Sequence, residues 1–284
     1  MKTLKKLMAV AGIICIAVSL PISIVSGQVL WSDFLGGPSV RVELLKPKML
    51  WDDYYGYEYD ITTGAVFLEY TLPLSEHISF LGNFSWAHAG LKNPNTLFGS
   101  QSEGCLGNPY AGFLTFNNPR TLSAEIGFWV PIRSNCCNSA AEIGMLSGFV
   151  ENTGSFTCDN IVMRCLVTFH NYDLSGTVLS IRGGPLFVSG EEESKDLFLC
   201  YGVQAGLGGE KLSLSGSIDG LILLTDSELN FNERNVPEFK LAVGYQLKGI
   251  QPGVKIIAPL DKDYIGRMVN YTYAFSLNWS PAQN

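Results

Sequence analysis

The sequence predicts an all-β fold, a transmembrane antiparallel up-and-down β-barrel of about twelve strands, with roughly 10–14 compatible. Three observations predict it. Hydrophobicity alternates with a period of two, charged residues make up only 16% of the 284 residues, and short connections alternate with long ones. After the N-terminal segment no run reaches the roughly 18–20 unbroken apolar residues of a membrane helix. A membrane-spanning part would therefore consist of strands.

Residues 1–27 have the pattern of a cleaved signal peptide. A basic start precedes an apolar run broken by Pro21, and Val25 and Gly27 place small residues before Gln28. The alternative is an uncleaved anchor. Cleavage would remove three lysines and change the formal charge from −7 to −10. An acidic exported chain lacks the cationic patch that nucleic-acid binding requires, so we expect no nucleic-acid partner.

Residues 28–284 are predicted to form a single outer-membrane β-barrel domain, since no linker or internal repeat divides them. The alternation predicts strands at 38–46, 64–74, 76–90, 107–117, 120–132, 160–170, 175–188, 196–207, 210–225, 237–248, 252–260 and 268–280. One stretch has helical spacing instead and predicts a short helix, through Ala140, Ile143, Leu146 and Val150.

The connections between these strands alternate in length. Long ones are expected at 47–63, 91–106, 133–159, 189–195, 226–236 and 261–267. Tight turns are expected near Ser75, Asn118, Asn171 to Leu174, Gly208–Gly209 and Gly249–Gln251. Short periplasmic turns, long extracellular loops and two periplasmic termini are typical of an outer-membrane barrel. A Greek-key sandwich has no reason to keep this alternation.

The two faces of each predicted strand differ in charge. In the final strand Tyr271, Phe275 and Trp279 alternate with small polar residues. A charge facing lipid near the midplane costs about 2–4 kcal/mol, so a bilayer enforces such a separation. The polar parity predicts a lumen lined by Arg41, Glu43, Glu69, Glu125, Arg164, Arg182, Lys211, Asp219, Glu238, Lys240, Lys255, Asn270 and Asn278. The alternative is a secreted soluble β-sandwich, whose outer face would be richer in Lys and Glu.

A motif lies in "GNPYAGFLTFNNPRTLSAEIGFWVPI", which begins at Gly107. This stretch resembles a hairpin of bacterial outer-membrane barrels of the putative transporter, phenol meta-pathway transporter-like group. The matching positions are Gly107, Asn108, Pro109, Tyr110, Gly112, Gly127 and Pro131. The resemblance covers about a tenth of the chain. It implies an outer-membrane barrel that transports small molecules, including aromatic or other apolar compounds.

Four cysteines of the exported chain are candidates for disulfides in an oxidising compartment, with their pairing left open: Cys105, Cys136, Cys137 and Cys158. The longest loop, 133–159, holds three of them and the apolar helical stripe. We expect this loop to fold inward or cap the pore, tied to its neighbour through Cys105.

No motif indicates an enzyme, a metal site or a cofactor. Of the three histidines, His77 and His170 are expected near the periplasmic ends of separate strands and His88 near the outer rim. Nothing in the sequence places a serine and an acid beside any of them. Glu191–Ser194 could bind a cation or form a solvated loop tip. Trp51–Asp60 could contact a ligand or partner, or pack its tyrosines on the rim.

The sequence therefore predicts passive or facilitated passage of small molecules across the outer membrane, without enzymatic activity. The expected partners are outer-membrane lipid and a small-molecule solute, while the oligomeric state is left open. A non-transporting barrel, acting as a surface adhesin or structural anchor, is the alternative within the same fold.

Overall fold

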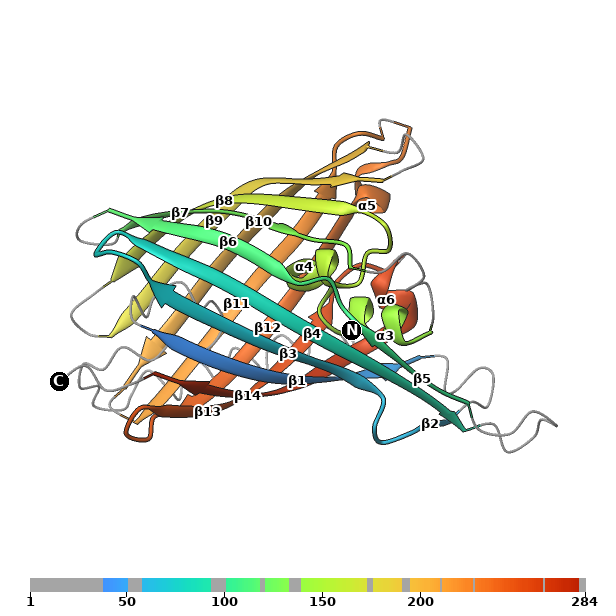
Figure 1. Ribbon diagram of the computed structural model, residues 1–284, viewed down its shortest axis with the longest axis horizontal. Coiled ribbons are helices and arrows are strands. Elements are labelled where there is room, and N and C mark those ends of the chain that lie inside the picture. The colour runs from blue at the N-terminus through green and yellow to red at the C-terminus, as the bar shows by residue number, and fades with distance from the viewer. Residues whose placement is uncertain are drawn as a thin grey trace, which may run out of the picture.

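The chain forms one antiparallel β-sheet that closes into a barrel (Figure 1). The computed structural model describes residues 38–50, 58–92, 101–117, 121–132, 139–172, 176–190, 195–209, 211–226, 228–262 and 264–280. Its strands are β1 (Ser39–Met49), β2 (Glu58–Tyr59), β3 (Gly64–Pro73), β4 (Ile78–Lys92), β5 (Gln101–Leu106), β6 (Tyr110–Phe116), β7 (Leu122–Trp129), β8 (Ile161–Tyr172), β9 (Thr177–Ser189), β10 (Lys195–Gly208), β11 (Leu212–Leu223), β12 (Asn235–Tyr245), β13 (Ile250–Pro259) and β14 (Val269–Trp279).

These fourteen segments make twelve barrel strands. Both β2 and β3 pair with one edge of β4, and both β5 and β6 pair with its other edge, so each pair forms one interrupted strand. Every other strand pairs with its sequence neighbours, and β1 pairs with β14 from Val40↔Trp279 onward. The prediction of a closed twelve-stranded barrel is confirmed. The alternative of a two-sheet sandwich is wrong.

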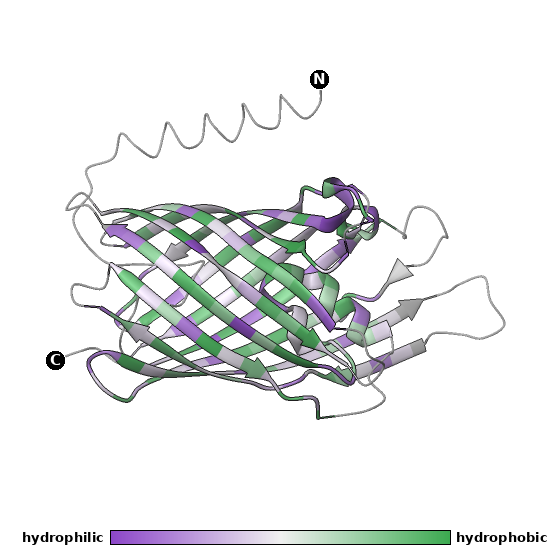
Figure 2. Cartoon of the chain, turned by 90° about the horizontal axis from the view of Figure 1, so that it is seen from above, coloured by the Kyte–Doolittle hydropathy of each residue, from purple (hydrophilic) through white to green (hydrophobic). Residues whose placement is uncertain are grey.

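The period of two separates the outside of the barrel from its inside. In β14, Tyr273 and Phe275 are 46% and 59% exposed, whereas their neighbours Thr272 and Ala274 are 2% and 1% exposed. Hydrophobic and hydrophilic residues alternate along the strands in the same way in Figure 2. Successive strand residues point to opposite faces, so this pattern gives the barrel an apolar outer wall.

Most strand bounds agree with the prediction, but the expected loop 91–106 is wrong in its last part, where residues 101–106 form β5 and pair with β4. In β14 one position departs from the expected parity. Between Lys48 and Met49 the pairing of β1 with β14 shifts by one residue, and Val269 rather than Asn270 becomes the buried neighbour. A β-bulge of this kind adds one residue to one strand and reverses the parity beyond it. Asn270, predicted to line the lumen, is therefore exposed.

The two ends of the barrel differ. At the end here called the turn end, short connections join the strands, for example Gly249 with φ +84° between β12 and β13. At the opposite end, here called the loop end, lie the helices α3 (Ser139–Ser147), α4 (Phe149–Asn152), α5 (Phe231–Arg234) and α6 (Ile265–Met268), and the 3₁₀ turn η2 (Thr153–Ser155) (Figure 1). No helix within the described ranges is long and apolar enough to cross a membrane.

A plug formed by residues 139–157, which comprise α3, α4, η2 and the two residues after them, enters the barrel from the loop end. The predicted stripe is buried, with Ala140 at 0% and Ile143 and Leu146 each at 2% exposure. Helix α3 packs against β1, β3, β4 and β5. The expected inward folding of this loop is confirmed.

The barrel wall is apolar where it contacts the plug, although the strands carry polar residues inward elsewhere. Inward Leu45 and Phe67 pack with α3, and inward Val162 and Leu186 belong to a second cluster with Val150 of α4. Burying such side chains stabilises the docked plug by about 1.5–3 kcal/mol for each large one.

The outward face provides a test of membrane insertion. Val203 faces outward midway along β10. We expect Val203→Arg to destabilise the barrel folded in phospholipid bilayers by about 2–4 kcal/mol. Leu224→Arg, just after β11 at the loop end, should cost only about 0–1 kcal/mol, because a charge there reaches the interface. Equal costs in denaturant titrations would contradict a bilayer around this face.

Candidate functional site

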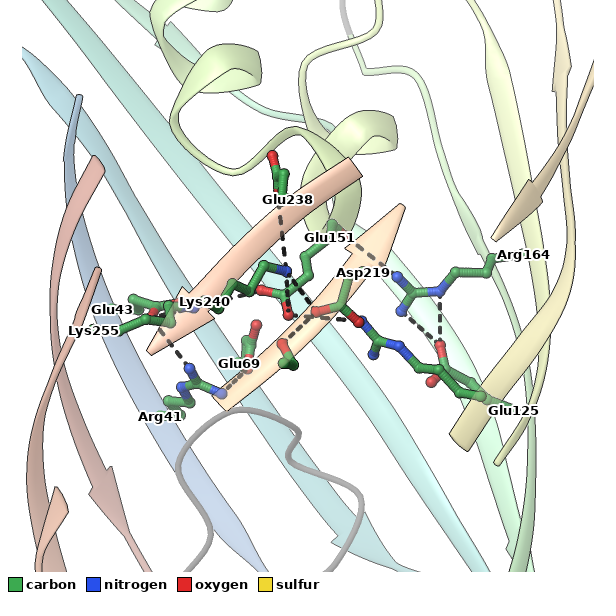
Figure 3. A network of polar contacts seen from close by, with 12 residues as sticks. Arg41, Glu43, Glu69, Glu125, Glu151, Arg164, Asp219, Glu238, Lys240 and Lys255 are labelled. Atoms are coloured by element: carbon green, nitrogen blue, oxygen red, sulfur yellow. Dashed lines mark hydrogen bonds and ion pairs between the residues drawn. The ribbon is translucent and has the colours of Figure 1, made fainter. Parts of the chain in front are cut away.

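A belt of charged side chains crosses the inside of the barrel below the plug (Figure 3). The wall supplies ten of its members, each in an ion pair: Arg41, Glu43, Glu69, Glu125, Arg164, Arg182, Asp219, Glu238, Lys240 and Lys255. They occupy the inward parity of β1, β3, β7, β8, β9, β11, β12 and β13. Opposite charges therefore meet across strands that lie far apart in sequence.

The plug contributes one carboxylate, Glu151 of α4, which reaches into the middle of this belt (Figure 3). Its oxygens lie 3.0 Å from Lys240 Nζ, 3.5 Å from Lys255 Nζ and 3.7 Å from an Arg182 nitrogen. Lys240 is fully buried and also lies 3.4 Å from Asp219. Removing one partner from a buried ion pair costs about 3–5 kcal/mol, so Glu151 is a strong anchor of the plug.

Glu151 belongs to the connection between β7 and β8 rather than to a membrane-spanning strand. Burial acts to raise the pKa of its carboxyl, but attraction from Lys240, Lys255 and Arg182 outweighs burial. These cations hold the pKa well below the usual 4.5. The carboxylate is therefore charged, and the anchor intact, at neutral pH.

A second contact between plug and wall centres on Arg164. Its Nε and Nη2 donate to one oxygen of Glu125 at 3.1 and 2.7 Å, and its Nη1 donates to the Glu151 backbone carbonyl at 3.2 Å. The guanidinium also lies over the rings of Tyr110 and Trp129, 5.3 and 5.0 Å from their centroids. Stacking and the two hydrogen bonds to one Glu125 oxygen together fix its orientation.

A partly open cavity of about 80 Å³ lies between the belt and the lower surface of the plug. It is lined by Arg41, Glu69, Tyr70, Thr71, Leu81, Gly82, Asn83, Tyr110, Glu125, Trp129, Glu151, Asn152, Arg164 and Arg182. Its wall combines hydrogen-bond donors, acceptors and aromatic rings.

The stretch Gly107–Tyr110, singled out by the sequence, is where the wall holds the plug. Strand pairing stops between β5 and β6, and the Asn108 amide instead donates to the carbonyls of Gly154 and Thr157 at 3.1 and 2.8 Å. Asn108 N–H also donates to the Ser155 carbonyl at 2.5 Å. A β-carbon on Gly107 would lie 2.6 Å from that same carbonyl, so only glycine allows this close approach.

The remaining residues of the motif support the aromatic pair. The Tyr110 hydroxyl donates to Glu125, and its ring covers Gly112 and Gly127, where a side chain would collide with it. An aromatic residue near a strand end would be expected in a girdle on the outer face of the barrel, but for Tyr110 this expectation is wrong. It is 6% exposed and faces inward, because strand β6 begins at Tyr110 with that parity.

Two other predicted lumen residues lie outside the belt. Lys211 is exposed beside β11 at the turn end, where the chain leaves the barrel. Asn278 is half-buried on the inward face of β14 near the turn end. Inward residues at this end are mostly uncharged, such as Gln204, Ser213 and Gln251, the last of which donates to Ser213 at 3.2 Å.

Sequence reasoning missed Glu151, Asn83, Tyr110 and Trp129 as members of the site. For Trp129 a signal existed, because it shares the parity of Glu125 on the same strand. Glu151 follows directly after the apolar stripe, and no local pattern indicates that it faces a set of cations. Its partners are set by the docking of the plug.

One histidine has contacts that the sequence did not predict. The ring of His170 lies between the hydroxyls of Ser123 and Ser180, each 3.1 Å from a ring nitrogen, and all three residues are buried. The pairing of β8 with β7 and β9 brings these serines together. His88 contacts the Ser102 hydroxyl at 2.8 Å near the loop end.

Several sequence predictions concern residues that the structure does not describe. Cys136, Cys137, Glu191–Ser194 and positions 51–57 lie outside the described residues. Cys105 is buried and Cys158 partly buried, and the described part of the chain shows no disulfide. Among the described residues there is also no cluster of ligands suited to a metal ion.

Comparisons with known proteins give structural likeness without sequence relationship. No family model matches the chain, and no curated protein matches its sequence. The COG4313 outer membrane channel from Pseudomonas putida F1 is similar in structure, with a TM-score of 0.57 and 9% identity over 89% of this chain and 99% of that one. LpxR from Salmonella typhimurium gives 0.52 and 9% identity over 85% and 99%.

The KdgM porin gives a TM-score of 0.49 at 10% identity, over 86% of this chain and 99% of that one. At such identities the likeness to the channel and to LpxR shows the fold alone, a barrel of the outer-membrane type. The narrower resemblance to the phenol meta-pathway transporter-like group stays a prediction.

The hydrogen bonds of Asn108 predict which part of the plug loosens when this side chain is removed. Asn108→Ala should leave the carbonyls of Gly154 and Thr157 without this donor, at a cost of about 1–3 kcal/mol. We expect hydrogen exchange of amides 149–157 to become about 5- to 150-fold faster. Asn117→Ala, which removes a similar bond in a short turn, is the control. Unchanged plug exchange in Asn108→Ala would contradict the clamp.

Proposed function

We propose that this protein is a plugged outer-membrane channel through which small hydrophilic molecules pass when the plug moves out of the lumen. Its support is a closed barrel with an apolar outer wall and a polar inside. We propose further that residues 1–27 direct export and that the turn end faces the periplasm, as the sequence predicts.

The observation that carries this proposal is the way α4 is held. Its deepest contact is Glu151, an ionic anchor between one carboxylate and three cations. Ion pairs of this kind can exchange for water once the plug begins to leave, whereas a purely apolar plug would lose its whole burial energy. The contact suits a plug that is released.

The chemistry of the lumen also bears on the solute. Apolar or aromatic substrates are implied by the motif resemblance alone. A belt of ten charged wall residues favours hydrophilic molecules, because an apolar one would have to displace water from charged groups without replacing its hydrogen bonds. We therefore propose hydrophilic solutes, carried without chemical conversion.

The runner-up is a non-transporting barrel that acts as a surface anchor. Its specific support is that the plug and the belt occupy the lumen together. In that case α4 would be a permanent part of the core, and the ion pairs would serve stability alone.

Conductance across planar bilayers distinguishes the two. We expect the wild type to be mostly closed and Glu151→Gln to raise the open fraction at least about tenfold, since 1.4 kcal/mol is already a factor of ten. Glu142→Gln is the matched control, because this plug carboxylate has no ion pair within the described chain. Wild-type and Glu151→Gln barrels that both stay closed would favour the anchor.

The low pKa of Glu151 predicts the pH dependence of opening. Its charge stabilises docking above the usual 4.5, and that contribution is lost only as pH falls through the lowered value. The open fraction should be constant between about pH 7 and pH 5 and should rise on further acidification. Other carboxylates of the belt lie around Glu151 on the wall: Glu43, Glu69, Asp219 and Glu238.

Glu151→Gln isolates the contribution of Glu151 from that of these neighbours. Its open fraction should already be high at neutral pH and should change less on acidification than that of the wild type. An equal acid response in both proteins would assign the effect to the wall carboxylates.

A further inference from the structure

The cavity below α4 has no excess charge available to an ion, although charged residues form most of its wall. Arg41 pairs with Glu43 and Glu69 at 3.2 and 3.8 Å, and Arg164 pairs with Glu125 at 2.7 Å. An anionic ligand would compete with a carboxylate for its guanidinium, and a cationic one would compete with an arginine. Breaking a buried pair is costly, so neither is favoured.

Beyond the ion pairs, the wall still offers hydrogen-bond donors and hydrogen-bond acceptors. Arginine has five N–H groups, and the described bonds of Arg164 use three of them. Glu69 and Glu125 have lone pairs beyond those in their ion pairs. A ligand that both donates and accepts hydrogen bonds would satisfy both sets.

One side chain in the cavity wall, Asn83, has a buried acceptor without a hydrogen-bond donor among the described residues. Asn83 lies inward on β4, is 9% exposed, and its amide nitrogen donates to Glu69 at 3.4 Å. Because the amide nitrogen is turned toward Glu69, the amide oxygen points away from Glu69. This oxygen is buried and has no hydrogen-bond donor among the described residues. A buried acceptor without a partner costs about 1–3 kcal/mol, which a ligand hydroxyl would recover.

We propose that this cavity binds the hydroxyl groups of a small, electrically neutral polyhydroxy solute. The inference rests on the proposed passage function and names the chemical class of its cargo. Each hydroxyl can accept from an arginine N–H and donate to a carboxylate or to Asn83 without disturbing an ion pair. The cavity of about 80 Å³ is partly open, so it admits the hydroxyl-bearing edge of such a solute while the rest of the molecule stays in the lumen.

Binding to the full-length protein folded in detergent tests this without any transport measurement. Glucose, glucuronate and glucosamine share one ring and differ in charge, and phenol represents an apolar solute. Saturation-transfer NMR at neutral pH should show glucose bound at least about tenfold more tightly than the other three. Preference for glucuronate, glucosamine or phenol, or the absence of glucose binding in both wild type and Glu151→Gln, would overturn the proposal.

Substitutions of Asn83 test whether glucose binds in this cavity. Asn83→Leu should weaken glucose binding at least about tenfold, and the smaller change Asn83→Ala should also weaken it if the leucine variant does not fold. Asn278→Leu is the matched control, since Asn278 is another inward asparagine with an unpaired oxygen among the described residues but lies outside the cavity. Equal glucose binding by folded Asn83→Ala and wild type would remove the site.

This experiment separates the two proposals. A barrel that binds glucose but never conducts would contradict passage and keep the cavity assignment. A barrel that opens in Glu151→Gln but binds no glucose would keep the channel and contradict its cargo.

Discussion

Charges enclosed by the barrel must be paired, and much of the interior follows from this constraint. Lys240 and Asp219 are fully buried on neighbouring strands, where an isolated charge would be far too costly. The wall meets the requirement with cross-strand pairs, and α4 adds Glu151 to the same network. The ion pairs therefore specify both the middle of the lumen and the depth at which the plug stops.

Above this belt the constraint changes from charge to packing. Inward positions of the strands become apolar where α3 and α4 fill the barrel, as at Leu45, Phe67 and Leu186. The Gly107–Tyr110 stretch lies between the charged belt and the apolar region around the plug. Its glycine and asparagine hold the backbone of η2, and its tyrosine lies against Glu125 and Arg164. A short interruption of one strand thus positions both the plug and the cavity below it.

Most of the barrel could be predicted from the sequence, because a strand's two faces differ in their surroundings at every residue. The twelve strands, their antiparallel order and the alternation of turns and loops all follow from that local signal. It failed at Asn270, where a bulge reverses parity, and at Tyr110, where an aromatic residue near a strand end faces inward rather than toward lipid.

The sequence by itself determined which side chains share a face, since alternation is a property of consecutive residues. Only the tertiary structure decided which of them meet. Lys255 and Glu151 are 104 positions apart and approach within 3.5 Å because the sheet closes and the β7–β8 connection turns into it. The cavity, the unpaired Asn83 oxygen and the anchor of the plug all depend on such distant approaches, which no local pattern encodes.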